Sequence, residues 1–242
     1  IRSAPMDEGH WAYQYHLDLL SRAARESAGK CLPSMGAFYH AGDTLAALRG
    51  TEQLLYDCIE RPDVVRDAEE YLMDMWFEFY DRAYAEVYEV SDHGSVCWFG
   101  LWAPGKTYAV SNDFSYNISP RMFQDLFLPA IRRQTEFLDY SIYHVDGVGA
   151  FRHVESLCEL PKLQALQILP GAGQPSPLHY TDVLARVQAA GKNLHITIAP
   201  EEVEPALKQL SARGLMIQTR CETESQAHRL LRDVEKRSVD RR

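Results

Sequence analysis

Apolar and polar positions along this chain follow two periods, and these predict helices and short buried strands. Apolar residues at helical spacing predict helices at residues 11–28, 43–59, 63–90 and 119–138. Pro129 lies inside the last of these and is expected to kink or break it.

Short apolar runs between the helical stretches predict six buried strands. These runs cover residues 31–38, 95–102, 141–145, 165–169, 194–198 and 215–219. The last four alternate with predicted helices at residues 150–157, 178–190, 201–211 and 224–236. Residues 103–118 are predicted as a loop. Each strand is followed by a helix at a spacing suited to parallel crossovers, so the pattern indicates an α/β fold.

Composition narrows the class of protein. The 242 residues are 46% hydrophobic and 24% charged, which is typical of a soluble globular protein. A net charge of -9 argues against a nucleic-acid partner, and no segment reads as a membrane span. Five cysteines, odd in number and unclustered, favour a reducing compartment such as the cytoplasm.

A TIM-like (β/α)8 barrel that lacks its first two strands accounts best for six parallel strands. The prediction is a single domain over residues 1–242, truncated at its amino terminus because the chain begins with Ile1. An open, doubly wound sheet is the alternative, although no glycine-rich phosphate loop follows any strand. Exposed sheet edges would favour a homo-oligomer or a complementing amino-terminal segment.

Residues competent to bind zinc stand where predicted strands end. His144 and Asp146 close one strand, and Cys221 follows the last. The carboxyl ends of barrel strands form the catalytic face, so these three predict a zinc site with one open position. The alternative is that each is an ordinary buried residue. His195 lies within a strand, where a wet barrel interior or simple bonding to polar neighbours would both account for it.

Several motifs together resemble the uroporphyrinogen decarboxylase superfamily. The likeness rests on their order and spacing over most of the chain. The motifs are LRG (residues 48–50), RPD (61–63), ISPRMF (118–123), LPAI (128–131), YHVDG (143–147), GK (191–192) and CETE (221–224).

The resemblance implies a TIM-like barrel and one of two chemistries. Decarboxylases of the superfamily act on a tetrapyrrole without metal, whereas its methyltransferases use zinc and exchange a methyl group with a corrinoid protein. The methyltransferases carry a His-x-Cys pair where this chain has His144-Val145-Asp146, and a zinc-ligand cysteine near the position of Cys221. Replacing a thiolate by a carboxylate leaves zinc a stronger Lewis acid, which suits a small methylated substrate.

Other residues at the same predicted rim are candidates for substrate chemistry. The resemblance implies catalytic roles for two of them: it places Asp113 near a substrate-contacting position and Tyr39 near a substrate-binding tyrosine of the decarboxylases. Trp102, Tyr116 and His40 are predicted to contact substrate. For Asp113, a turn or helix-entry role is an equal alternative.

Three functions follow from these observations. The leading one is zinc-assisted methyl transfer between a small methylated substrate and a corrinoid protein. The first alternative is metal-free decarboxylation of a tetrapyrrole. The second alternative is a non-catalytic ligand-binding paralogue or truncated remnant.

Overall fold

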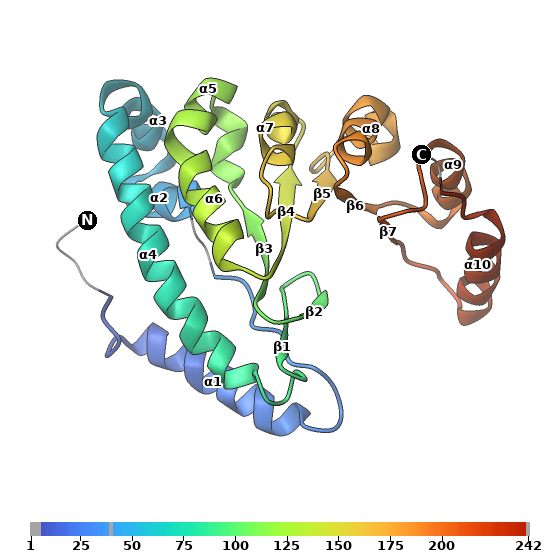
Figure 1. The fold of residues 1–242 in the computed structure, drawn as a ribbon, viewed down its shortest axis with the longest axis horizontal. Helices are drawn as coiled ribbons and strands as arrows, with labels where there is room; N and C mark the ends of the chain where they lie inside the picture. The colour runs from blue at the N-terminus through green and yellow to red at the C-terminus, as the bar shows by residue number, and fades with distance from the viewer. Residues whose placement is uncertain (1–5, 39–40, 241–242) are drawn as a thin grey trace. The chain divides into compact units, whose positions relative to one another are not determined.

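The chain folds into two compact units, residues 1–142 and 143–242. The computed structural model describes residues 6–38 and 41–240. The boundary between the units falls inside strand β4 (Tyr140–Asp146). Each unit is therefore described by itself (Figure 1).

The first unit is mainly helical. Its helices are α1 (Trp11–Ser27), α2 (Ala41–Arg49), α3 (Thr51–Glu60), α4 (Pro62–Val87), α5 (Pro120–Met122) and α6 (Leu128–Phe137), with the 3-10 helix η1 (Asp113–Asn117) and the π-helix η2 (Phe123–Phe127). Its strands are β1 (Gly94–Val96), β2 (Trp102–Pro104) and β3 (Thr107–Ser111). Its core is an aromatic cluster in which Trp76 and Tyr80 of α4 contact Tyr108 of β3 and Phe137 of α6.

Three predictions in this unit are wrong in detail. The predicted helix 43–59 is two helices, because Gly50 adopts a φ of 86° that ends one helix and begins the next. The predicted strand 95–102 is an antiparallel hairpin of β1 and β2, paired Val96 to Trp102. The predicted loop 103–118 contains β3, which the sequence pattern missed.

The predicted strand 31–38 is also wrong. It forms only an isolated bridge from Ser34 to Val96. The Tyr108 hydroxyl binds both the amide and the carbonyl of Phe38, so a side chain holds this backbone in place of a neighbouring strand.

The second unit alternates strands and helices as predicted. Its strands are the end of β4, then β5 (Ala165–Leu169), β6 (Asn193–Thr197) and β7 (Leu215–Gln218). Its helices are η3 (Ala150–His153), α7 (Val154–Cys158), η4 (Pro177–His179), α8 (Thr181–Ala189), η5 (Pro200–Glu202), α9 (Val203–Gln209) and α10 (Glu224–Arg237).

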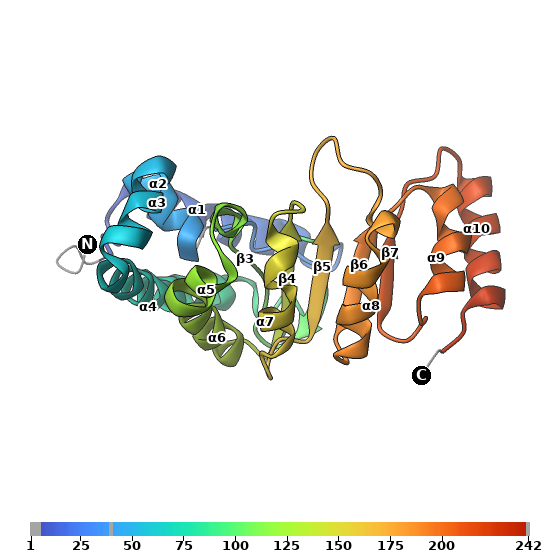
Figure 2. The same cartoon turned by 90° about the horizontal axis from the view of Figure 1, so that it is seen from above.

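Strand order in the larger sheet is β3-β4-β5-β6-β7. The neighbours β5, β6 and β7 are parallel, with Leu166 paired to Leu194 and Leu194 paired to Leu215. Figure 2 shows β5, β6 and β7 side by side in sequence order. The predicted parallel α/β architecture is thus confirmed, whereas the described strands do not close into a barrel.

Candidate functional site

The sheet of the second unit has one apolar and one polar face. On the apolar face, Leu166 and Leu194 are register partners and are almost completely buried. On the opposite face, Gln167 pairs in register with His195. Because side chains alternate along a strand, the polar residues of neighbouring strands share this face. We call this set the polar row; it comprises Asp146, His144, Gln167, His195 and Gln218.

His144 lies at the centre of the contacts in the polar row. Its Nδ1 is hydrogen-bonded to Oε1 of Gln167. Because a carboxamide oxygen only accepts, Nδ1 carries the proton in this arrangement. The other ring nitrogen, Nε2, lies 3.8 Å from Oδ2 of Asp146. Gln167 therefore fixes the ring so that Nε2 is the nitrogen on the side of Asp146.

His195 is enclosed, with 2% of its surface exposed. Burial lowers the pKa of His195 below its usual 6.5, because a charged imidazolium is poorly solvated in the interior. A hydrogen bond with Gln218 opposes this shift, and the nearby His144 adds to it. We therefore expect His195 to be neutral at pH 7. The interpretation of His195 as a buried histidine bonded to polar neighbours agrees with this geometry.

The loops after β4 and β5 approach each other beside Asp146. Gly147 has a φ of 83°, and its amide donates to the carbonyl of Leu169. A Cβ atom at Gly171 would lie 3.3 Å from the Cα of Gly147 and 3.8 Å from Oδ1 of Asp146. The two glycines therefore keep the backbone close to the Asp146 carboxylate.

Cys221 does not join His144 and Asp146. It follows β7 and is half-buried. Two strands lie between β4 and β7, so at a spacing of about 4.8 Å the two strands are separated by about 14 Å. Among the described residues, the ligand atoms of these three side chains do not all lie within 4.8 Å of one another. The structure therefore brings together two of the three predicted zinc ligands.

The remaining predicted site residues belong to the first unit. Asp113 is exposed and begins η1, and its amide donates to Oδ2 of Asp43 at 3.1 Å. Tyr116 is exposed in the same 3-10 helix. Trp102 is partly exposed in β2, and its indole N–H donates to the carbonyl of Ser91. Tyr39 and His40 lie outside the described residues.

Sequence reasoning missed Gln167 and Gln218. Each is a lone polar residue in an otherwise apolar strand. Alternate residues of a strand point to opposite faces of the sheet. A polar residue on the same side of each successive strand would have indicated a polar face. The register that pairs Gln167 with His195 depends on how β5 and β6 assemble, so the sequence of either strand alone does not contain it.

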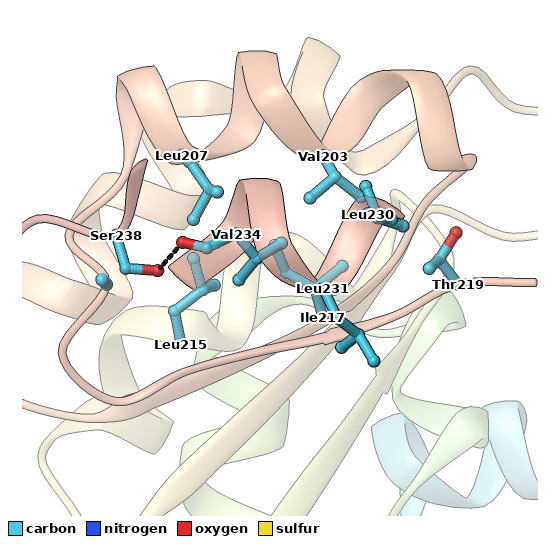
Figure 3. Close-up of a pocket in the computed structure, with 10 residues that line it drawn as sticks. Val203, Leu207, Leu215, Ile217, Thr219, Leu230, Leu231, Val234 and Ser238 are labelled. Carbon is cyan, nitrogen blue, oxygen red and sulfur yellow. Dashed lines mark hydrogen bonds between the residues drawn. The ribbon is translucent and has the colours of Figure 1, made fainter. Parts of the chain in front are cut away.

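An apolar cavity lies on the other face of β7 from the polar row. It has a volume of about 190 Å³ and is bounded by α9, β7 and α10. Figure 3 shows Leu215 and Ile217 of β7 facing Val203, Leu207 and Val234 across it. The lining holds no titratable side chain, so this cavity has no means of acid–base or metal chemistry.

In the described part of the chain, no helix is both long enough and apolar enough to span a bilayer. Comparison of the sequence with protein-family models found no matching family. Comparison with curated proteins likewise found no significant match.

Proposed function

We propose that this chain is an enzyme of the uroporphyrinogen decarboxylase superfamily that transfers a methyl group between a small methylated substrate and a corrinoid carried by a partner protein. The observation that carries the proposal is the His144–Asp146 pair at the carboxyl end of β4, with Nε2 and Oδ2 3.8 Å apart. Strand carboxyl ends hold the active sites of parallel α/β enzymes.

We propose that the sheet belongs to a TIM-like barrel, which is the fold of the superfamily that the sequence resembles. Strands β5, β6 and β7 neighbour one another in sequence order, as barrel strands do. A doubly wound sheet requires a point at which the strand order reverses, and these three strands have none.

The donor set at the end of β4 fits zinc in part. An imidazole nitrogen and a carboxylate oxygen are common zinc ligands. A ligating histidine usually donates its other N–H to a fixed acceptor, and Gln167 fills that role for His144. His144 and Asp146 would hold the ion. Cys221 lies apart from them and is not part of the proposed ligand set. Bound zinc would supply Lewis-acid polarisation of the atom that carries the methyl group.

On this proposal, the other residues of the polar row orient the His144 ring and set the charge around it. Gln167 fixes the His144 ring. His195 is enclosed, and in its neutral form it adds no charge beside His144. Apart from the Asp146 carboxylate the polar row carries no acidic side chain, so on this proposal the substrate is small, polar and uncharged.

Metal-free decarboxylation of a tetrapyrrole is the second candidate. The separation of Cys221 from the His144–Asp146 pair favours it, because a thiolate-containing zinc site marks the methyltransferases. On this alternative, the same pair would act in proton transfer.

Zinc binding tests the proposal directly. Chelator-treated protein is titrated with Zn²⁺, and bound metal is counted by mass spectrometry. We expect His144→Ala and Asp146→Ala to lose the bound zinc and Cys221→Ser to keep it. His228→Ala is the matched control, because His228 and Glu224 form a similar pair at 4.0 Å on the exposed helix α10.

Activity separates the two reactions. Demethylation of methylcobalamin is followed by its visible absorbance with small thiol, amine and alcohol acceptors. Zinc-dependent demethylation that His144→Ala abolishes supports methyl transfer. Zinc binding that survives in His144→Ala would refute the proposed site, and decarboxylation of a tetrapyrrole by metal-free protein would favour the second candidate.

A further inference from the structure

The first unit contains a cavity between three of its helices. Helices α2, α3 and α4 pack against one another, and the cavity that they enclose has a volume of about 240 Å³ (Figure 1). Four of its lining side chains are apolar and buried, and together they come from all three helices: Leu45, Leu54, Val65 and Ala68. The cavity therefore offers an apolar space that a hydrocarbon group can fill.

Three charged side chains line the same cavity. The carboxylate of Asp57, on a side chain that is 11% exposed, accepts from Nε of Arg49 at 2.6 Å and lies 3.1 Å from Nη2 of Arg61. The hydrogen bond from Arg49 lowers the pKa of Asp57 below its usual 3.8, so the carboxyl is charged at pH 7. Two guanidiniums share one carboxylate, and this cluster therefore carries an excess of one positive charge.

The Asp57 carboxylate leaves several donors of the two arginines unused. Arg49 binds it through Nε and Nη2, and Arg61 through Nη2. Within the part of the chain that the structure describes, Nη1 of Arg49 and both Nε and Nη1 of Arg61 have no partner. Because Asp57 already holds both guanidiniums in place, an incoming anion pays little entropy to order them.

We propose that this cavity binds a small monocarboxylate with an apolar body, of the kind that a medium-chain fatty acid represents. The carboxylate accepts hydrogen bonds from Arg49 and Arg61, which suits the planar, charged donors of guanidinium groups. The hydrocarbon body lies against Leu54, Val65 and Ala68.

Charge and volume define the ligand class. One excess positive charge matches a single carboxylate, and the apolar lining offers no partner to a second polar group. A cavity of about 150 Å³ admits benzene, so the larger space in this protein has room for roughly eight carbon atoms. The inference goes beyond the proposed reaction and does not depend on it.

Titration of the full chain with octanoate, 1-octanol and acetate tests the assignment. Isothermal calorimetry from about 10 µM to 2 mM covers dissociation constants in the millimolar range and below. We expect octanoate to saturate one site and to bind at least about tenfold more tightly than 1-octanol, which lacks the charge, or acetate, which lacks the apolar body. Failure of octanoate to saturate, or equal affinity for octanoate and either other probe, would overturn the proposal.

Removing one arginine locates the bound carboxylate. Arg61→Gln leaves Arg49 on Asp57, and we expect it to weaken octanoate binding about tenfold while 1-octanol binding stays unchanged. Arg82→Gln is the matched control, because Arg82 is also an exposed arginine in an ion pair, 3.8 Å from Glu8, and does not line the cavity. Equal losses in the two variants would assign the effect to the overall charge of the protein and refute the site.

A second pair of variants changes the charge without removing an arginine. Val64 lines the cavity from the first turn of α4 and is 61% exposed, so its replacement leaves the buried lining intact. Val64→Asp should weaken octanoate binding, because the new carboxylate competes for the same guanidiniums, whereas Val64→Asn, of the same shape but uncharged, should not. Octanoate binding that is the same in both variants would contradict the site, and circular dichroism confirms that each variant remains folded.

Discussion

Glu69 is the most constrained ionisable residue of the first unit. It lies in α4, it is fully buried, and neither carboxyl oxygen has a hydrogen-bond partner among the described residues. Burial raises the pKa of Glu69 well above its usual 4.5, and the nearby carboxylates of Asp43 and Glu70 add to the shift. The neutral acid is therefore the form that the folded state favours.

Replacing Glu69 by glutamine should remove a pH dependence of stability. The unfolded chain loses this proton near pH 4.5, whereas the folded chain retains it to higher pH. Stability from the neutral acid is therefore fully present below pH 4.5 and is lost as pH rises through the folded pKa. We expect Glu69→Gln to gain stability relative to wild type between pH 5 and 8, measured by urea unfolding. Glu86→Gln, exposed on the same helix, should show no such trend.

At the scale of elements, Pro129 explains the broken helix α5–η2–α6. Proline has no amide hydrogen, so the carbonyl four residues earlier, that of Asp125, loses its helical donor. Arg66 of α4 supplies a replacement, since its Nε donates to the Asp125 carbonyl at 3.0 Å. The π-helical turn η2 lies at this point.

Arg66→Ala should destabilise the first unit by about 1 kcal/mol, because it leaves that carbonyl without its donor. Arg121→Ala is the control: its guanidinium lies 3.5 Å from the Asp125 carboxylate and is 90% exposed. An exposed ion pair of this kind contributes at most about 0.5 kcal/mol. Equal losses in urea unfolding for the two variants would contradict the role assigned to Arg66.

At the scale of the whole molecule, the five free cysteines report on both units. Cys31, Cys58 and Cys97 belong to the first unit, and Cys158 and Cys221 to the second. Cys31 is exposed, whereas Cys58 and Cys97 are buried. Burial, with Asp57 and Glu69 nearby, raises the pKa of Cys58 to about 11. The thiolate is the reactive form of cysteine. Burial therefore lowers the reactivity of Cys58 in two ways: it raises the pKa of the thiol, and it blocks access of the reagent.

Pulse labelling with iodoacetamide at pH 8 should therefore modify Cys31 first, and Cys58 and Cys97 only when the first unit unfolds. Peptide mass spectrometry at increasing urea concentrations gives the order in which the cysteines are labelled. In the same samples, labelling of Cys158 and Cys221 monitors unfolding of the second unit. Cys58 labelled as fast as Cys31 in native protein would show that the described packing around it is wrong.

The sequence alone determined most of the second unit. The strands around 141–145, 165–169, 194–198 and 215–219 are each found within about one residue, because short apolar runs bounded by turns are a local signal. It also located the break at Pro129, since a missing donor acts within its own helix.

Only the tertiary structure decided the rest. The prediction of a strand at residues 31–38 was wrong, because the Tyr108 hydroxyl, 70 residues away in the sequence, binds the backbone of Phe38. The polar row depends on register between strands, which no local pattern contains, so Gln167 was missed beside His144. Cys221 matched a ligand by type and position at a strand end, yet two intervening strands separate it from His144. Residue type and periodicity are local properties, whereas distance between strand ends is set by the order in which the strands assemble.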